Sequence, residues 1–264
     1  MGISTLLALA GLAVMPAIPA MAQLATPNAM GVAMGHIHLY VKDIAAEQQF
    51  FEALGGKPVN NEKLQMVQFP GVFIVFRKAD NEGGTVGSTV NHFGFFMKSV
   101  PDTVAKMKAA GYKVEQTNNP EQAFVTGPQD IRVELYQDAA MPGPVRMHHI
   151  HLFVTDPKEA QTWYDKNFGA TAGKRAQFDT SNLPGVELTM GKADTPQAPT
   201  KGRVLDHIGF EVTNIEDTVK RLDAAGIKID GGAIRTSPNA SKLHIAFLTD
   251  PWGTYIELTQ GLTP

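Results

Sequence analysis

Cysteine is absent from this sequence of 264 residues. Disulfide frameworks, cysteine nucleophiles and thiolate metal sites are therefore excluded. The formal net charge is −3, so the composition gives no reason to expect nucleic-acid binding or a basic membrane-binding surface. A chain of this length buries a sizeable core without covalent staples. Any chemistry must come from the eight histidines and the carboxylates.

Charged side chains are also missing from the N-terminal region, where Lys42 is the first Lys, Arg, Asp or Glu. An apolar run covers residues 3–18, and Ala20-Met21-Ala22 follows it as a small-x-small cleavage site. We predict a signal peptide over residues 1–22, cleaved after Ala22, and a linker over 23–33. An uncleaved anchor is the alternative, but the run is shorter than the roughly 20 residues that cross a bilayer. We expect a periplasmic or secreted protein with no stable membrane span.

A fourfold internal repeat organises the rest of the chain. The segments 35–44, 91–100, 148–157 and 206–215 each begin near a histidine and continue as a short alternating strand. Seven of the eight histidines lie in or against these segments. A helical pattern follows each segment, and two or three strand-like stretches follow the helix. The repeat predicts four modules, each of roughly 50 to 60 residues, of the order strand, helix, strands.

Capping signals and strand patterns give the expected elements and boundaries. The expected helices begin at Asp43, Pro101, Asp156 and Asn214, and each ends before a glycine. The clearest later strands are expected at 72–79, 131–136, 186–192 and 255–260. Pro142-Gly143-Pro144 is typical of a linker. We therefore expect two domains of two consecutive modules each, residues 34–141 and 148–264, joined by 142–147.

Strand alternation places the polar side chains on one face. Successive side chains point to opposite faces of a sheet, so His36, His38 and Tyr40 share the face turned away from the helix. The glutamates of the final strands lie on the matching face, so a concave polar surface results. Two histidines and one glutamate suit Fe(II), Mn(II), Ni(II) or Zn(II) with open positions for substrate. The sequence holds this set twice, as His36, His92 and Glu134, and as His149, His207 and Glu257.

A single strand histidine is more often a hydrogen-bonded structural residue, but repetition at equivalent positions favours metal binding. The segments HIHLFVTD (149–156), DHIGFEV (206–212) and DPWGTYIEL (250–258) resemble the vicinal oxygen chelate superfamily, which includes glyoxalase I, bleomycin-resistance proteins and extradiol dioxygenases. The resemblance covers about residues 34–261. It implies an α+β fold in which four βαβββ modules pair into two cup-shaped half-barrel domains.

The resemblance also implies a ligand set and a chemistry. First-strand histidines of two paired modules and a glutamate on the final strand would hold the divalent ion, and these positions fall on the two sets named above. The ion would chelate vicinal oxygens of a small substrate and act as a Lewis acid. The set with His149, His207 and Glu257 is preferred because Asp250-Pro251-Trp252-Gly253 matches the family turn, whereas residues 127–130 are a degraded version of it.

Departures from the family pattern bear on the reaction. Extradiol dioxygenases carry a tyrosine where Phe247 stands, and His244 lies on the opposite strand face, so ring cleavage is disfavoured. Glu187 resembles a fourth ligand of glyoxalase I and is a candidate ligand or base, although a solvated strand residue is equally compatible. Phe73 takes its place in the first half.

Other polar residues share the cup faces. His151 and His38 are candidates for proton transfer or for pocket lining. Tyr255 and Tyr136 are candidate hydrogen-bond donors to the substrate.

Two functional classes remain open at this point. We expect an exported, divalent-metal-dependent enzyme of glyoxalase-like lyase, isomerase or dioxygenase type that acts on a small oxygenated molecule. The alternative is a non-catalytic binding protein of the bleomycin-resistance type, which would generally lack the two metal sets. Pairing of two halves within one chain allows a monomer, and a homodimer is equally compatible.

Overall fold

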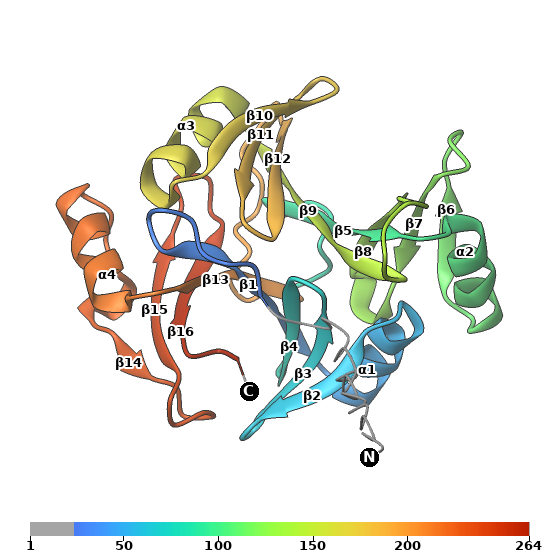
Figure 1. The fold of residues 1–264 in the computed structure, drawn as a ribbon, viewed down its shortest axis with the longest axis horizontal. Helices are drawn as coiled ribbons and strands as arrows, with labels where there is room; N and C mark the ends of the chain where they lie inside the picture. The colour runs from blue at the N-terminus through green and yellow to red at the C-terminus, as the bar shows by residue number, and fades with distance from the viewer. Residues whose placement is uncertain (1–23, 264) are drawn as a thin grey trace, which may run out of the picture.

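The computed structural model describes residues 24–263, and four repeats of strand, helix and three strands make up the chain (Figure 1). Module 1 contains β1 (Val32–Val41), α1 (Ile44–Ala53), β2 (Lys57–Asn61), β3 (Leu64–Phe69) and β4 (Val72–Lys78). Module 2 contains β5 (Val90–Met97), α2 (Val100–Ala109), β6 (Lys113–Gln116), β7 (Gln122–Thr126), the short helix η1 (Pro128–Asp130) and β8 (Arg132–Gln137).

The second half of the chain repeats the same order. Module 3 contains β9 (Val145–Val154), α3 (Pro157–Phe168), β10 (Thr171–Arg175), β11 (Phe178–Leu183) and β12 (Val186–Lys192). Module 4 contains β13 (Leu205–Val212), α4 (Ile215–Ala224), the short helix η2 (Asp230–Gly232), β14 (Arg235–Thr236), β15 (His244–Thr249) and β16 (Tyr255–Gln260). The α+β class and the βαβββ modules predicted from the sequence are confirmed.

Three of the four helices begin where the capping signals predicted, whereas α2 begins at Val100, with Ser99 as its cap, rather than at Pro101. The side chains of Asp43, Asp156 and Asn214 each accept a hydrogen bond from a backbone N–H three residues later. Gly169 ends α3 in the left-handed conformation, with φ of 68°. The predicted signal peptide lies outside the described residues. Within residues 24–263, none of the helices combines the length and apolar character that a membrane crossing requires.

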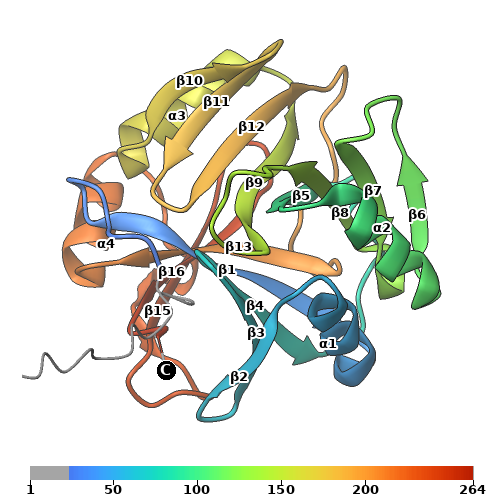
Figure 2. The same cartoon turned by 45° about the vertical axis from the view of Figure 1, so that its right-hand side comes forward.

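The strands form two eight-stranded sheets, one built from the first and last modules and the other from the two middle modules. One sheet has the order β14-β15-β16-β13-β1-β4-β3-β2 and therefore joins modules 1 and 4. The other has the order β10-β11-β12-β9-β5-β8-β7-β6 and joins modules 2 and 3. Figure 2 shows β1 and β13 crossing the middle of the molecule side by side. We call the concave face of the first sheet cup A and that of the second sheet cup B.

The expected division into residues 34–141 and 148–264 was therefore wrong for the sheets. Modules 1 and 2 lie in different sheets, and so do modules 3 and 4. The four modules carry equivalent polar faces, so the repeat alone does not identify which two pair. Residues 142–144, interpreted as a boundary between domains, connect β8 to β9 within one sheet.

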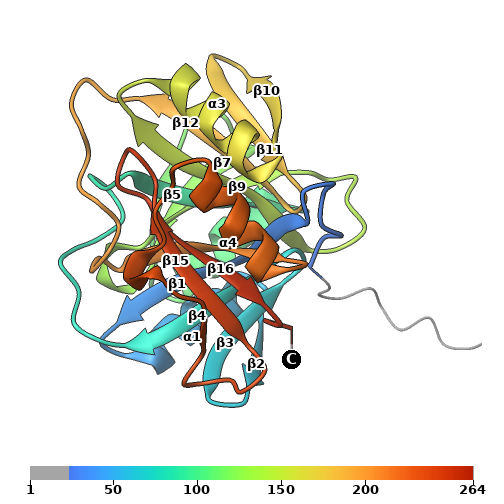
Figure 3. The same cartoon turned by 90° about the vertical axis from the view of Figure 1, so that its left-hand side faces the viewer.

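Consecutive modules nevertheless meet through a common core. One apolar cluster contains buried side chains from all four modules, including Phe51, Phe93, Phe168 and Phe210. Phe51 stacks on Phe93 between modules 1 and 2, and Phe168 packs on Phe210 between modules 3 and 4. Figure 3 shows α4 lying beside β15 and β16. The core thus fixes the backs of the two sheets and leaves the cups on their other faces.

A buried carboxyl lies at the contact between modules 1 and 2. Glu47 on α1 is fully buried and accepts a hydrogen bond from Gln129 Nε2 at 3.1 Å. Burial raises the pKa of Glu47 to about 8, although the bond from Gln129 opposes this rise. Between its ordinary pKa of 4.5 and about 8, the folded protein binds a proton that the unfolded chain releases. Stability is therefore lost as the pH rises through this range.

Replacing Glu47 with Gln should remove this pH dependence. We expect the Glu47→Gln variant to be more stable than the wild type at pH 8.5, by about 4 kcal/mol, and to be nearly equal at pH 4.5. Denaturant unfolding at several pH values measures the difference. Glu216→Gln, at an exposed site on α4, is the control. A stability gap that is the same at both pH values would contradict the assignment.

Candidate metal centres

Strand register brings the polar residues of two modules together in each cup. In the antiparallel pair β1–β13, His38 lies opposite His207 and His36 lies opposite Gly209. The parallel pair β13–β16 places Glu257 beside Gly209. In cup B the equivalent pairs are His151 with His92, His149 with Gly94, and Gly94 with Glu134.

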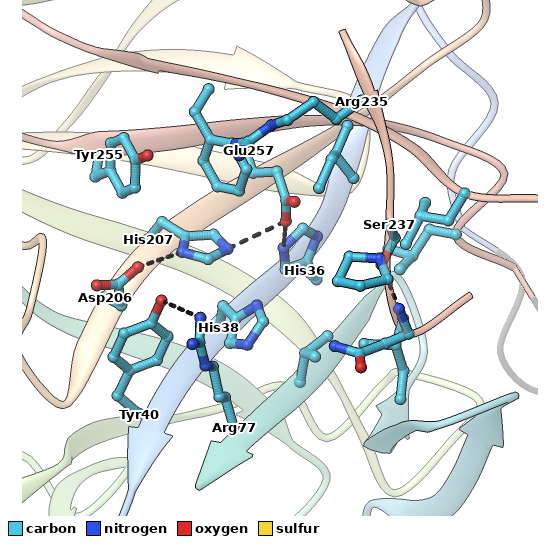
Figure 4. A pocket seen from close by; sticks show the side chains of 18 of the residues that line it. His36, His38, Tyr40, Arg77, Asp206, His207, Arg235, Ser237, Tyr255 and Glu257 are labelled. Atoms are coloured by element: carbon cyan, nitrogen blue, oxygen red, sulfur yellow. Dashed lines mark hydrogen bonds and ion pairs between the residues drawn. The ribbon is translucent and has the colours of Figure 1, made fainter. Parts of the chain in front are cut away.

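One carboxylate oxygen joins two imidazoles in cup A. Glu257 Oε2 lies 2.8 Å from His36 Nε2 and 3.1 Å from His207 Nε2. The other ring nitrogen of His207, Nδ1, lies 2.6 Å from Asp206 Oδ1. Figure 4 shows these contacts, with the His38 ring beside them. His36, His207 and Glu257 are all buried.

Cup B repeats this arrangement with different surroundings. Glu134 Oε2 lies 3.0 Å from both His92 Nε2 and His149 Nε2. Asn91 Oδ1 occupies the position behind His92, at 2.9 Å from Nδ1, where cup A has a carboxylate. Gln122 Nε2 donates to the second oxygen of Glu134 and to Tyr136 Oη.

The structure places all six predicted ligand residues in the cups but exchanges their partners. The predicted grouping of His36 with His92 and Glu134, and of His149 with His207 and Glu257, was wrong. Cup A instead combines His36 with His207 and Glu257, and cup B combines His149 with His92 and Glu134. Each set draws its first-strand histidines from two modules, as expected, but those modules are 1 and 4, or 2 and 3.

The donor atoms suit a divalent ion. In each cup, four residues each offer one ligand atom, and these four atoms all lie within 4.8 Å of one another. The residues are His36, His38, His207 and Glu257 in cup A, and His92, Glu134, His149 and His151 in cup B. In an octahedral site, ligand atoms about 2.1 Å from the ion lie about 3 Å apart when they are neighbours. They lie about 4.2 Å apart when they face each other across the ion. The observed separations of 2.8 to 3.1 Å match adjacent ligands.

The charges in cup A are arranged around His207. Burial lowers the pKa of His207, but the hydrogen bonds with Asp206 and Glu257 outweigh it and raise the pKa to about 9. Burial opposes ionisation of Glu257, yet its bonds from His207 and His36 lower its pKa overall. Burial also lowers the pKa of His36 and of His38, which keeps both rings neutral at pH 7. The neutral imidazole is the form that binds metals.

Cup A opens into a cavity of about 410 Å³. One wall is apolar and contains Leu64, Val75, Ile245 and Phe247. The cationic side chains Arg77, Lys201 and Arg235 also line the cavity. The cavity thus combines a candidate metal centre with space for a small molecule.

Aromatic side chains contact two histidines of cup B. Phe178 lies against His151, and Phe124 lies against His92 with Arg132 over its ring. Ile245 in cup A stands at the position of Gln122, which binds Glu134 in cup B.

Glu187, a predicted ligand or base, does not join either cluster. It lies beside His149 in the strand pairing, but Arg175 Nε lies 2.6 Å from Glu187 Oε1, and Thr189 Oγ1 donates to the same oxygen. Its catalytic role stays a prediction, and it requires Arg175 to release the carboxylate. His151 lies in the cup B cluster.

The remaining sequence candidates also have defined places. Tyr255 lies in cup A with its ring edge against His207 and with Lys201 over its face. Tyr136 lies against His149 in cup B. Phe247 faces the cup A cavity, whereas His244 is exposed.

Sequence reasoning missed the residues that support the clusters. Asp206 was read as part of a family segment, yet its position directly before His207 was the signal for a carboxylate behind a ligand. Gly209 and Gly94 leave room for a facing imidazole. A Cβ at Gly209 would lie 2.0 Å from the His36 ring, and a Cβ at Gly94 would lie 2.3 Å from the His149 ring.

A family model matches residues 146–258, and its description is the glyoxalase/bleomycin resistance protein/dioxygenase superfamily. The matched residues make up modules 3 and 4, so this half of the chain belongs to the superfamily. A curated relative from Arabidopsis thaliana, named "Probable lactoylglutathione lyase, chloroplastic", is 24% identical over 237 residues. The match covers 78% of this chain but only 65% of that relative's length.

Solved structures of the superfamily share the fold over most of the chain. Glyoxalase I from Zea mays has a TM-score of 0.68 at 19% identity, with 87% of this chain and 92% of the maize chain covered. A Bacillus subtilis protein, described provisionally as a dioxygenase, has a TM-score of 0.66 at 14% identity, covering 90% of this chain and 86% of that chain. At these identities the likeness establishes the half-barrel fold of this chain.

Filling the space at Gly209 should disrupt cup A. We expect Gly209→Ala to lower the free energy of unfolding by about 1–3 kcal/mol because the new methyl group displaces the His36 ring. Denaturant unfolding measures the loss. Gly143→Ala is the control, since the nearest contact of its added Cβ is 3.9 Å away. A Gly209→Ala protein as stable as the control would contradict the packing described here.

Proposed function

We propose that this protein is a divalent-metal-dependent enzyme whose reaction takes place in cup A. The observation that carries the proposal is the joining of His36, His207 and Glu257 at the end of an open cavity. In each cup, two imidazoles and one carboxylate leave positions for substrate on Fe(II), Mn(II), Ni(II) or Zn(II). When bound, the ion supplies Lewis-acid stabilisation of negative charge on substrate oxygens.

The protein's own residues would prepare the cavity for this chemistry. Asp206 accepts from His207 Nδ1, which directs Nε2 of this ring toward Glu257 and the centre of the cup. Asp206 is itself held by the backbone N–H of Gly202. The apolar wall excludes water around a bound molecule, and the hydroxyl of Tyr255 is a candidate donor to a substrate oxygen.

The cavity favours a small oxygenated substrate with a lyase or isomerase type of reaction. The names of the Arabidopsis and maize relatives support this class over ring cleavage. Phe247 supports it as well, because this ring stacks on Tyr255 and meets His207 edge-on, with no hydroxyl to offer to a substrate. Turnover with methylglyoxal and glutathione, compared with a panel of catechols, separates the two classes.

Export is part of the proposal. The apolar, uncharged residues 3–18 and the Ala20-Met21-Ala22 site support a signal peptide cleaved after Ala22. Expression of the full chain in a bacterial host, followed by N-terminal sequencing of the periplasmic fraction, tests it. A mature protein that begins at Gln23 supports export, and full-length protein retained in the cytoplasm contradicts it.

Metal content is the first test of the enzymatic proposal. We expect the purified protein to bind a divalent ion in stoichiometric amount, and we expect His207→Ala to lose the ion of cup A together with turnover. His244→Ala is the control, since this histidine is exposed and its side chain lies outside both clusters. Elemental analysis and the two substrate assays measure these quantities. No bound ion, with small-molecule binding unchanged in His207→Ala, would favour a non-catalytic binding protein.

The carboxylate behind His207 gives a second test. Replacing Asp206 with Asn should weaken metal binding in cup A by about 10- to 100-fold, because the amide orients the ring without its negative charge. Competition with a chelator measures the affinity. The exposed Asp217→Asn on α4 is the control. Equal affinities for the two variants would show that Asp206 has no part in metal binding.

A further inference from the structure

His38 is a half-buried residue whose two ring nitrogens are buried and have no hydrogen-bond partner in the described part of the chain. Both its ring nitrogens are inaccessible to solvent, and neither makes a hydrogen bond within residues 24–263. The ring lies in cup A beside His207, with ring centroids 4.4 Å apart, because the two residues face each other across β1 and β13. A nitrogen of His38 lies within 4.8 Å of ligand atoms from His36, His207 and Glu257.

The same feature recurs independently in module 3. His151 lies two residues after His149, as His38 lies two residues after His36. Its Nδ1 is 3.3 Å from His92 Nε2, while its own Nε2 is buried and has no hydrogen-bond partner in the described part of the chain. It belongs to the cup B cluster in the same way.

The strands next to these histidines offer no competing ligand. In cup A, β4 places Phe73 and Val75 beside His36 and His38. In cup B, β12 places Glu187 beside His149, but Arg175 holds this carboxylate. A buried polar group without a hydrogen-bond partner costs free energy. The nitrogens of His38 and His151 that lack such a partner are therefore free to bind an ion.

We propose that His38 is the fourth ligand of the ion in cup A and that His151 is the fourth ligand in cup B. This inference rests on the proposed metal-binding function. Each centre then consists of three imidazoles and one carboxylate. Four protein ligands complete a tetrahedral zinc site, whereas a six-coordinate ion keeps two positions for substrate oxygens. The four-ligand set therefore favours Mn(II), Fe(II) or Ni(II) for a reaction on two neighbouring oxygens.

A cobalt(II) titration of the full-length protein tests the proposal. The variants are His38→Gln and His151→Gln, which keep the volume but remove the imidazole. Tyr40→Phe is the matched control, because Tyr40 lies two residues after His38 on the same face and lines the same cavity. Competition with a chelator gives the affinity. Proton NMR of the cobalt protein counts the paramagnetically shifted, exchangeable imidazole N–H signals, one for each ligating ring.

We expect three such signals for each loaded cup, one for each histidine of the cluster. His38→Gln should lose one signal and bind cobalt in cup A at least tenfold more weakly, and His151→Gln should do the same in cup B. Tyr40→Phe should match the wild type. His38→Asp, which supplies an anionic carboxylate in place of the neutral amide oxygen, should bind cobalt more tightly than His38→Gln.

Each contrary result has a definite meaning. Two signals per loaded cup in the wild type would overturn the inference, and this count needs no variant to fold. Wild-type affinity in His38→Gln would also overturn it and would leave His38 as a proton-transfer or pocket-lining residue. If the wild type itself binds no cobalt, the proposed function fails first.

Discussion

The antiparallel pairing of β1 with β13, and of β9 with β5, is the constraint on which both cups depend. Each pair sets a histidine opposite a histidine and another histidine opposite a glycine. A shift of one residue would turn every imidazole into the core, because side chains alternate between faces. Register irregularities occur on both sides of the histidine segment in each pair, between Met34 and His36 and between His38 and Leu39 in the first. Such bulges re-aim side chains and fix register locally.

Much of this arrangement was predictable from the sequence, since alternation and capping are local properties. The faces of the first strands followed from the two-residue period, and Asp43, Asp156 and Asn214 marked the helix starts. The pairing of modules was not predictable from these signals, because four copies of one module carry equivalent strands. One difference did hold information. Modules 1 and 3 read His-x-His, whereas modules 2 and 4 read His-x-Gly.

That difference restricts pairing for a steric reason. The glycine makes room for the imidazole that faces it, so a His-x-His strand requires a His-x-Gly partner. Pairing of module 1 with 3 is thereby excluded, and so is pairing of 2 with 4, because it would leave modules 1 and 3 to pair with each other. Two arrangements remain, and both satisfy the steric rule. In one, module 1 pairs with 2 and module 3 with 4. In the other, module 1 pairs with 4 and module 2 with 3. The choice depends on long-range packing of four apolar faces into one core, which no local pattern encodes.

The two cups share their ligand groups but differ in how the protein satisfies them. In cup B, Gln122 donates to Glu134 and to Tyr136. Hydrogen bonds within the protein therefore satisfy several polar atoms of this cup. In cup A, Ile245 stands at the position of Gln122, and Phe73 and Val75 stand at those of Glu187 and Thr189. Apolar side chains cannot form hydrogen bonds with buried polar atoms, and the nitrogens of His38 make none within residues 24–263. Cup A has apolar neighbours in place of these partners and opens into a cavity, so its buried polar groups are satisfied less completely by the protein itself than those of cup B.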